Sequence, residues 1–96
     1  MELFIFGRFH ARASDEGGVE NALRTVVAAS REEAGCLNIH AFRSARDARL
    51  FDVHSRWIDE AAFDVHGGLP HTVRFVEQVQ PLLDHPLDVT RTHLLA

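Results

Sequence analysis

The sequence predicts an α+β fold, in which a four-stranded antiparallel sheet carries its helices on one face. Two observations support this prediction. Segments with strand-like and helix-like patterns follow one another in the order β-α-β-β-α-α-β. Only a short polar segment, residues 44–49, separates the second and third strands, as expected for an antiparallel hairpin. With 96 residues the chain forms a single domain, residues 1–96, because a second core would not fit.

The first predicted strand, residues 3–11, is largely apolar on both faces. Phe4 and Phe6 lie on one face. The other face carries Leu3, Ile5, Gly7, Phe9 and Ala11. A domain of this size has one core, so its own helices can cover only one of these faces. We therefore expect a second copy of the chain to cover Phe4 and Phe6, which predicts a homodimer.

The first helix is expected to begin after Ser14 and Asp15, which offer an N-cap, and to run to Glu33. Its apolar residues recur at helical spacing, at Val19, Leu23, Val26 and Val27. Gly35 is expected to follow the last turn as the C′ residue. Residues 36–43 and 50–57 alternate in polarity and form the predicted hairpin strands.

Two short helices and a final strand complete the predicted order. Asp59 is placed to cap a helix that carries Ala62, Phe63 and His66 on one face and ends at Gly67-Gly68. Pro70 suits the first position of the next helix. That helix carries Val73, Val76 and Val79 and ends at Pro81. Residues 87–94 alternate weakly and are expected to form the last strand.

The composition excludes several kinds of partner. The formal net charge is −4, which argues against nucleic acid or an anionic membrane. The single cysteine, Cys36, excludes an internal disulfide. The apolar run at the N-terminus stops at Gly7-Arg8 and has no basic flank, so it is too short for a signal peptide or a membrane span. We expect a cytoplasmic protein.

Two histidines at a predicted helix–helix corner are the leading candidates for chemistry. His66 ends one helix, where the helix dipole favours a protonated ring, and His71 begins the next, where the dipole favours a neutral ring. Either histidine alone could be an ordinary polar residue at a helix end. Together, across the short segment 67–70, they indicate a pocket.

Other candidate residues have weaker support. His40 and His54 lie on neighbouring strands and, with His10, could bind a metal. The alternation of the two strands, however, does not place both histidines on one face. No His-x-His or Cys-x-x-Cys spacing supports a metal, so none is expected. Trp57 could stack on a planar ligand or belong to the core. Cys36 has no histidine placed beside it by spacing, and we do not expect it to act as a nucleophile.

Three segments of the chain form a recognisable set. The first is Glu32-Glu33-Ala34-Gly35-Cys36-Leu37. The second is Arg56-Trp57 followed by Asp59-Glu60-Ala61-Ala62. The third joins His66 to Pro70-His71, with the aromatic Phe75 four residues later. Together they resemble the antibiotic biosynthesis monooxygenase (ABM) domain family, whose helix-to-strand junction is similar to the first segment. The resemblance extends over nearly the whole chain in length and in the order of elements.

The resemblance implies a ferredoxin-like dimeric α+β barrel with a cavity between sheet and helices. The implied lining consists of Ile5, Gly7, Phe9, Trp57, Phe63, His66 and His71. Enzymes of this family oxygenate phenolic or quinol substrates with O₂ and use no flavin, haem or metal. By this resemblance His71 is the expected catalytic base. His66 or Arg56 would stabilise the substrate anion, and Trp57 would stack on its ring.

The sequence also departs from known patterns within the family. Polyketide-oxidising members carry Asn and Tyr where this chain has Val53 and Phe63, and many quinol-oxidising relatives carry Glu where it has Ser55. Haem-degrading members carry Asn and Trp where it has Gly7 and His66, so haem degradation is disfavoured. The leading hypothesis is a cofactor-independent monooxygenase, which would be an oxidoreductase. The alternatives are an isomerase that uses the same histidines without oxygen, and a non-catalytic ligand-binding dimer.

Overall fold

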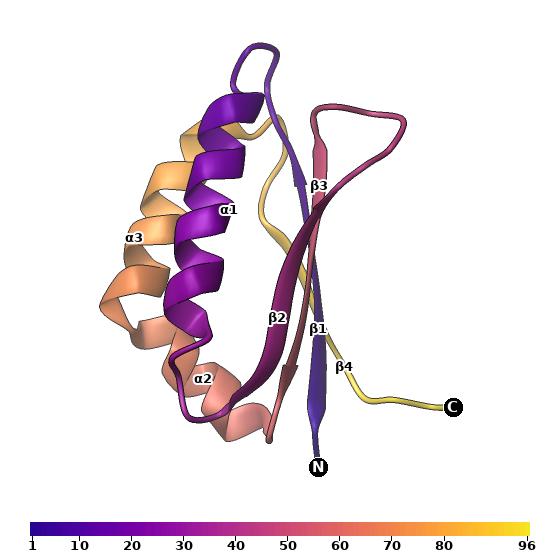
Figure 1. Ribbon diagram of the computed structural model, residues 1–96, viewed down its shortest axis with the longest axis vertical. Helices are drawn as coiled ribbons and strands as arrows, with labels where there is room; N and C mark the ends of the chain where they lie inside the picture. The colour runs from indigo at the N-terminus through magenta and orange to yellow at the C-terminus, as the bar shows by residue number, and fades with distance from the viewer.

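The computed structural model describes residues 1–96 and shows one sheet with every helix on the same face (Figure 1). This arrangement confirms the predicted α+β fold and the predicted order of elements. The elements in chain order are β1 (Leu3–His10), α1 (Glu16–Ser30), β2 (Cys36–Arg43), β3 (Leu50–Trp57), α2 (Glu60–Gly68), α3 (Pro70–Val79), the 3₁₀ turn η1 (Gln80–Leu82) and β4 (Asp88–Thr92).

The strands pair in the order β2-β3-β1-β4, and each neighbouring pair is antiparallel. The predicted hairpin of β2 and β3 is confirmed, with an irregularity between Cys36 and Asn38. Beyond it, His40 lies directly opposite His54. The prediction that these two histidines do not share a face was wrong, because residues opposite each other in an antiparallel pair point to the same face.

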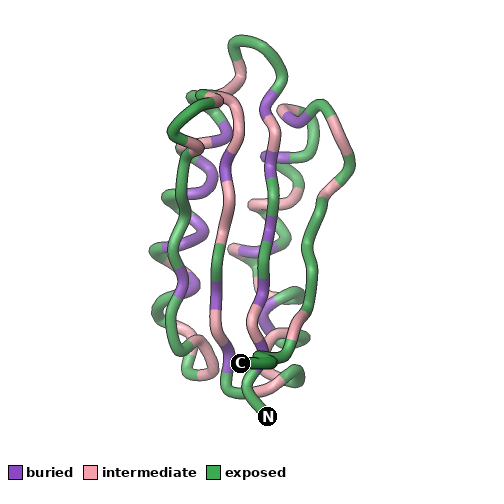
Figure 2. The backbone as a smooth tube through the Cα atoms, turned by 90° about the vertical axis from the view of Figure 1, so that its right-hand side faces the viewer, coloured by how far each residue is buried: buried purple, intermediate pink, exposed green.

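The core lies on the face of the sheet that the helices cover. Leu3, Ile5, Phe9 and Ala11 are all buried there, as predicted from the alternation in β1. Figure 2 shows this alternation as buried positions that recur between less buried ones along the central strands. The other face of the sheet carries Phe6, which is 46 % exposed. We call this uncovered face the outer face.

The first helix differs from its prediction at both ends. Asp15 is the N-cap residue, but its backbone is not extended and its side chain makes no capping hydrogen bond. The helix ends at Ser30, three residues before Glu33, and Arg31 is its C-cap. Gly35 has no positive φ and is therefore not a C′ residue. A Cβ atom on Gly35 would lie 2.5 Å from the Cβ of Ala62, so glycine is required there for close packing against α2.

The second and third helices begin as predicted. Asp59 has an extended backbone, and its Oδ1 accepts a hydrogen bond from the backbone N–H of Ala62 at 2.8 Å. Pro70 occupies the first turn of α3. The predicted apolar face of α3 was partly wrong, because Val73 is 43 % exposed while Thr72 is buried with Val79. The helix therefore packs against the rest of the fold through a face slightly rotated from the one that the three valines were predicted to form.

The β2 strand forms one edge of the sheet, and an arginine from the end of α1 reaches it. Arg31 donates two hydrogen bonds to the backbone carbonyl of Ile39, from Nε at 3.3 Å and from a terminal nitrogen at 3.0 Å. Ile39 itself is buried in the core. This contact ties the segment after α1 to the edge strand.

None of the helices has the length and apolar character needed to cross a bilayer.

Candidate active site

A cavity of about 180 Å³ lies between the inner face of the sheet and the helices. Most of its lining is apolar, and its polar side chains are Ser30, Ser55, His66 and Thr72. Of the residues expected to line a cavity, five do so: Ile5, Gly7, Phe9, Phe63 and His66. An apolar enclosure with a few polar groups is the usual form of a small-molecule site.

Both predicted histidines contact one carboxylate, that of Glu33. Glu33 Oε2 lies 2.7 Å from His66 Nδ1 and 2.7 Å from His71 Nε2. The three residues come from separate segments: the turn after α1, the last turn of α2 and the first turn of α3. The side chains of Glu33 and His66 are each 11 % exposed, so this contact is largely shielded from water. The helix–helix corner therefore brings the two histidines together through an acid.

The carboxylate fixes where each ring holds its proton. A carboxylate only accepts hydrogen bonds, so His66 Nδ1 and His71 Nε2 both donate to Glu33. Thr72 Oγ1 lies 3.3 Å from the same His66 Nδ1. The other ring nitrogen of His66, Nε2, makes no hydrogen bond within the chain and keeps its lone pair in the neutral ring. His66 can therefore accept a proton on the nitrogen that Glu33 does not hold.

Aromatic rings hold His66 in place from the core side. The ring centroids of Trp57 and His66 are 4.6 Å apart, and the Phe63 ring stacks on His66 at 5.4 Å. Trp57 is fully buried, and its indole N–H donates to Ser55 Oγ at 2.9 Å. These contacts restrict the orientation of the His66 ring, as a positioned acid–base group requires.

Three predicted site residues do not line the cavity. His71 lies behind His66, joined to it through Glu33, and the two ring centroids are 6.0 Å apart. Trp57 supports His66 and Phe63 from behind. Arg56 lies on the outer face opposite Phe4, where its guanidinium pairs with Glu2 at 2.7 Å. Neighbouring residues of a strand point to opposite faces, so Arg56 cannot share the inner face with Trp57.

The residues of this corner also have the donor types of a metal site. Ligand atoms of Glu33, His66 and His71 all lie within 4.8 Å of one another. Tetrahedral Zn²⁺ with bonds of about 2.0–2.2 Å would hold ligand atoms roughly 3.3 Å apart. The two oxygen–nitrogen distances of 2.7 Å are shorter and match charge-assisted hydrogen bonds. In this arrangement the carboxylate and the two histidines form one hydrogen-bonded group.

Glu33 and Ser30 were not predicted as site residues. Glu33 had one available signal: it belongs to an acidic pair at the C-terminal end of a helix, where the helix dipole disfavours negative charge. A partner elsewhere in the fold explains such a placement. Ser30 gave no comparable signal, because a serine near a helix end is common.

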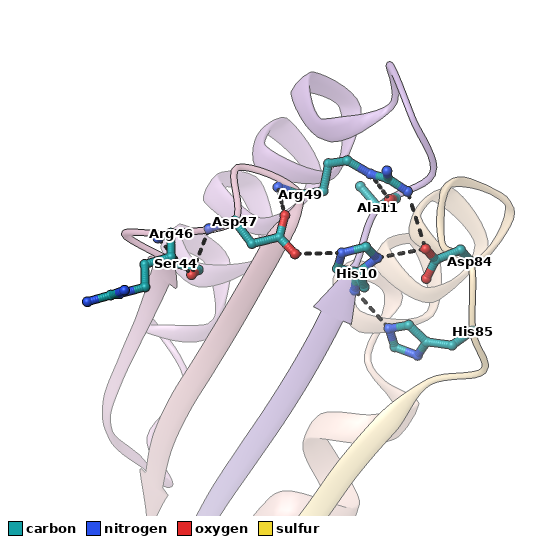
Figure 3. Close-up of polar contacts among 8 residues, drawn as sticks. All are labelled: His10, Ala11, Ser44, Arg46, Asp47, Arg49, Asp84 and His85. Carbon is teal, nitrogen blue, oxygen red and sulfur yellow. Dashed lines mark hydrogen bonds and ion pairs between the residues drawn. The ribbon is translucent and has the colours of Figure 1, made fainter.

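A second polar cluster lies at the opposite end of β1 (Figure 3). His10 Nδ1 lies 2.6 Å from Asp84 Oδ2, and His10 Nε2 lies 2.8 Å from Asp47 Oδ2. The backbone N–H of His10 also donates to His85 Nε2 at 2.7 Å. The hydrogen bond with Asp84, followed by that with Asp47, raises the pKa of His10. His10 thus joins the end of β1 to the segments on both sides of it.

The cysteine is not activated. Cys36 is half-buried at the start of β2, and its Sγ contacts the backbone oxygen of Asn38. Burial raises the pKa of this thiol, and the charge of Glu33 raises it further. A raised pKa leaves little thiolate at neutral pH, which agrees with the expectation that Cys36 is not a nucleophile.

Comparisons with known proteins agree with this architecture. The family model described as antibiotic biosynthesis monooxygenase matches residues 3–78. The protein named "Putative monooxygenase Rv0793" of Mycobacterium tuberculosis is 29% identical over 86 residues, which cover 90% of this chain and 84% of that protein. The structure of Rv0793 superimposes with a TM-score of 0.94 at 26% identity, covering 100% of this chain and 97% of the other. The structure of PA3566 from Pseudomonas aeruginosa gives a TM-score of 0.91 at 30% identity, covering 99% and 95%.

Proposed function

Because the chain belongs to the antibiotic biosynthesis monooxygenase family, we propose that it is an oxidoreductase that oxygenates a small phenolic or quinol substrate with O₂. In this proposal it uses no flavin, haem or metal. The substrate occupies the cavity between the sheet and the helices, and His66 accepts the phenolic proton. Glu33 and His71 position His66 from behind.

The observation that carries the proposal is the contact between Glu33 and His66 beside an otherwise apolar cavity. The Glu33 carboxylate accepts a hydrogen bond from His66 Nδ1, with 2.7 Å between Oε2 and Nδ1. This keeps the proton on Nδ1 and leaves Nε2 as the proton acceptor. A base held by a carboxylate is the arrangement that acid–base enzymes use to fix tautomer and orientation. A substrate that fills this mostly apolar cavity would displace water from it, which favours proton transfer within the site.

The reaction follows from phenol chemistry. His66 removes the phenolic proton, and the phenolate passes one electron to O₂ to form a phenoxyl radical and superoxide. These combine at a ring carbon, and the proton returns from His66 to give a hydroperoxide. Loss of water then leaves a quinone, so that one oxygen atom enters the ring and the other leaves as water. The balance is phenol plus O₂ to quinone plus H₂O, and the protein contributes positioning and proton transfer.

The role proposed for His71 follows from its place behind the base. It donates to the same Glu33 oxygen as His66 and so fixes the orientation of the carboxylate. Thr72, the next residue in α3, contacts His66 Nδ1 directly. We therefore assign proton transfer to His66 and the positioning of Glu33 to His71, with both histidines required for full activity.

Oxygen uptake tests the proposal. Chelator-treated protein is measured against a panel of dihydroxy-aromatic compounds, each with an autoxidation blank. We expect enzyme-dependent uptake, and a His66→Gln variant that lowers kcat by about 10²- to 10⁴-fold because it removes the base. His93→Gln is the matched control, since His93 is exposed near the C-terminus and contacts only the backbone of Glu2.

Two results would contradict the oxygenase proposal. Turnover that continues at the same rate without O₂ would favour the isomerase, because the Glu33–His66 pair also suits proton transfer between carbon and oxygen. Ligand binding without any product would favour a non-catalytic binding protein. Full activity in His66→Gln would remove His66 as the base while leaving the family activity possible.

The proposed assembly is a homodimer formed through the outer face. Phe6 is 46 % exposed and Phe42 48 % exposed, and the ring of His54 lies 5.0 Å from both. This aromatic group is larger than the scattered apolar residues of an ordinary surface, and a second copy would bury it. The cytoplasm stays the predicted location.

A further inference from the structure

Ser30 carries a buried hydroxyl that the fold does not use. It is the last residue of α1 and is 0% exposed. Its Oγ has no hydrogen-bond partner, although a helical serine commonly donates to the carbonyl four residues earlier. Buried polar atoms without a partner are uncommon because they lose their hydrogen bonds to water and regain none. The only other such atom is Oε2 of Glu16, which does not line the cavity.

The two other hydroxyl groups of the cavity each have one partner within the chain. Ser55 Oγ accepts the indole N–H of Trp57, and Thr72 Oγ1 contacts His66 Nδ1. Ser30 is one of the residues that line the same cavity, and its hydroxyl has no partner within the chain that would compete with a molecule bound there. The backbone oxygen of Ser30 accepts a hydrogen bond from the N–H of Glu33 at 3.1 Å, which places Ser30 at the same end as the Glu33–His66 pair.

The size of the cavity limits what can enter. Its volume is about 180 Å³. A dry protein cavity of roughly 150 Å³ accommodates one benzene molecule, whereas sites for drug-sized molecules take about 300–1,000 Å³. The space therefore suits a single ring with small substituents and is too small for a fused polycyclic compound. The apolar lining suits the ring, and the polar end suits a substituent that forms hydrogen bonds.

We infer that the cavity selects a single-ring ligand bearing a hydroxyl or oxo group, and that the Ser30 hydroxyl binds that oxygen. The inference deepens the proposed function and rests on it for the identity of the site. In a phenolic substrate, Ser30 would donate to the oxygen that loses its proton to His66 and would stabilise the phenolate. Ser30 is then the residue that distinguishes an oxygenated ring from a plain hydrocarbon ring.

Phenol and toluene test this inference without any turnover, because they have the same shape and differ in the hydroxyl. Binding of each is measured by isothermal titration and by the fluorescence of Trp57, the single tryptophan, which contacts His66. The quantity compared is the ratio of phenol affinity to toluene affinity, which cancels any change in cavity size. We expect this ratio to fall by about three- to tenfold in Ser30→Ala, the range for one hydrogen bond. Ser30→Cys, which keeps the volume with a weaker donor, should lower it in the same direction.

Thermal unfolding of the ligand-free variants supplies the control. Ser30→Ala should unfold at the same temperature as the parent protein or higher, because it removes an unpaired buried group. Ser55→Ala should unfold at a lower temperature, since it leaves the Trp57 N–H without its acceptor. An unchanged affinity ratio in Ser30→Ala overturns the inference, and so does tighter binding of 1-naphthol than of phenol. If the ratio falls but no oxygen uptake is found, the inference stands and the proposed oxygenase fails.

Discussion

His10 shows how one side chain can hold three segments together. Each of its ring nitrogens lies against a different aspartate, so both must carry a proton for both contacts to be hydrogen bonds. When both hydrogen bonds are formed, the ring is an imidazolium that bridges the loop after β2 and the segment before β4. The hydrogen bond from the Arg49 backbone N–H, followed by the one from His10, lowers the pKa of Asp47. The hydrogen bond from His10 lowers the pKa of Asp84.

These shifts predict a pH range for the contribution of His10 to stability. The pKa of His10 is raised above 6.5, so its stabilising effect is complete below that pH and is lost as the pH rises through the raised value. The aspartate pKa values are lowered below 3.8, so their effect is lost as the pH falls through the lowered values. We expect the cluster to stabilise most between about pH 4 and 6.5. Melting temperatures of the parent and His10→Gln should differ most in that range and converge at higher pH, whereas His93→Gln should follow the parent throughout.

Glu33 offers a second prediction at the scale of one residue. Glu33→Gln keeps the size of the side chain but removes the charge that holds His66 and His71. Because Glu33 does not line the cavity, KM should stay near that of the parent while kcat falls by about tenfold or more. Steady-state kinetics on any substrate found by oxygen uptake provide the measurement. A rise in KM with constant kcat would show that Glu33 acts on binding, contrary to its proposed role.

At the scale of elements, two aspartates at helix starts behave differently. Asp59 has an extended backbone and caps α2, whereas Asp15 has φ −102° and ψ 4° and makes no side-chain cap. Ser14, just before Asp15, has a φ of 72°, in the left-handed region that few residues other than glycine adopt. The conformation of the turn before α1 therefore determines that the Asp15 side chain does not cap the helix, and the residue type alone could not predict this.

Gly35 gives the prediction for this scale. Gly35→Ala should lower the free energy of unfolding by about 1–3 kcal/mol, because its Cβ would overlap that of Ala62 at 2.5 Å. Chemical denaturation measures the change. Gly17→Ala is the contrast, since nothing lies within 4 Å of a Cβ there, and it should stabilise α1 by about 0.5–1 kcal/mol. Recovery of stability on adding Ala62→Gly to Gly35→Ala would confirm the overlap as the cause.

The sequence predicted the fold well because alternation and helical spacing record which residues are buried. The bounds of β2 and β3 matched the pattern, and the two helix starts at Asp59 and Pro70 matched their capping chemistry. The site was predicted only in part. The corner with His66 and His71 was visible along the chain, but its link to Glu33 depends on how α1 ends against α2 and α3. The resemblance placed both Arg56 and Trp57 at the site, although adjacent strand residues face opposite ways.

For the whole molecule, the outer face determines the expected assembly. A charge at its centre should prevent a second copy from packing there, because burying an unpaired carboxylate is costly. We expect Phe6→Glu to weaken dimerisation by about tenfold or more. Light scattering after size-exclusion chromatography measures the mass across a dilution series. Val65→Glu is the control, since Val65 is exposed on α2, away from the sheet. A parent protein that stays monomeric at high concentration would refute the proposed dimer.

The contact between Arg31 and Ile39 bears on how such an assembly remains finite. An open sheet edge attracts strands from other molecules, and repeated edge pairing leads to aggregation. Here the carbonyl of Ile39, on the edge strand β2, is occupied by the guanidinium of Arg31, a bulky charge that an incoming strand would have to displace. The same arginine that closes the end of α1 therefore protects the edge. For the proposed dimer, an occupied edge at β2 favours association through the outer face over edge-to-edge addition of strands.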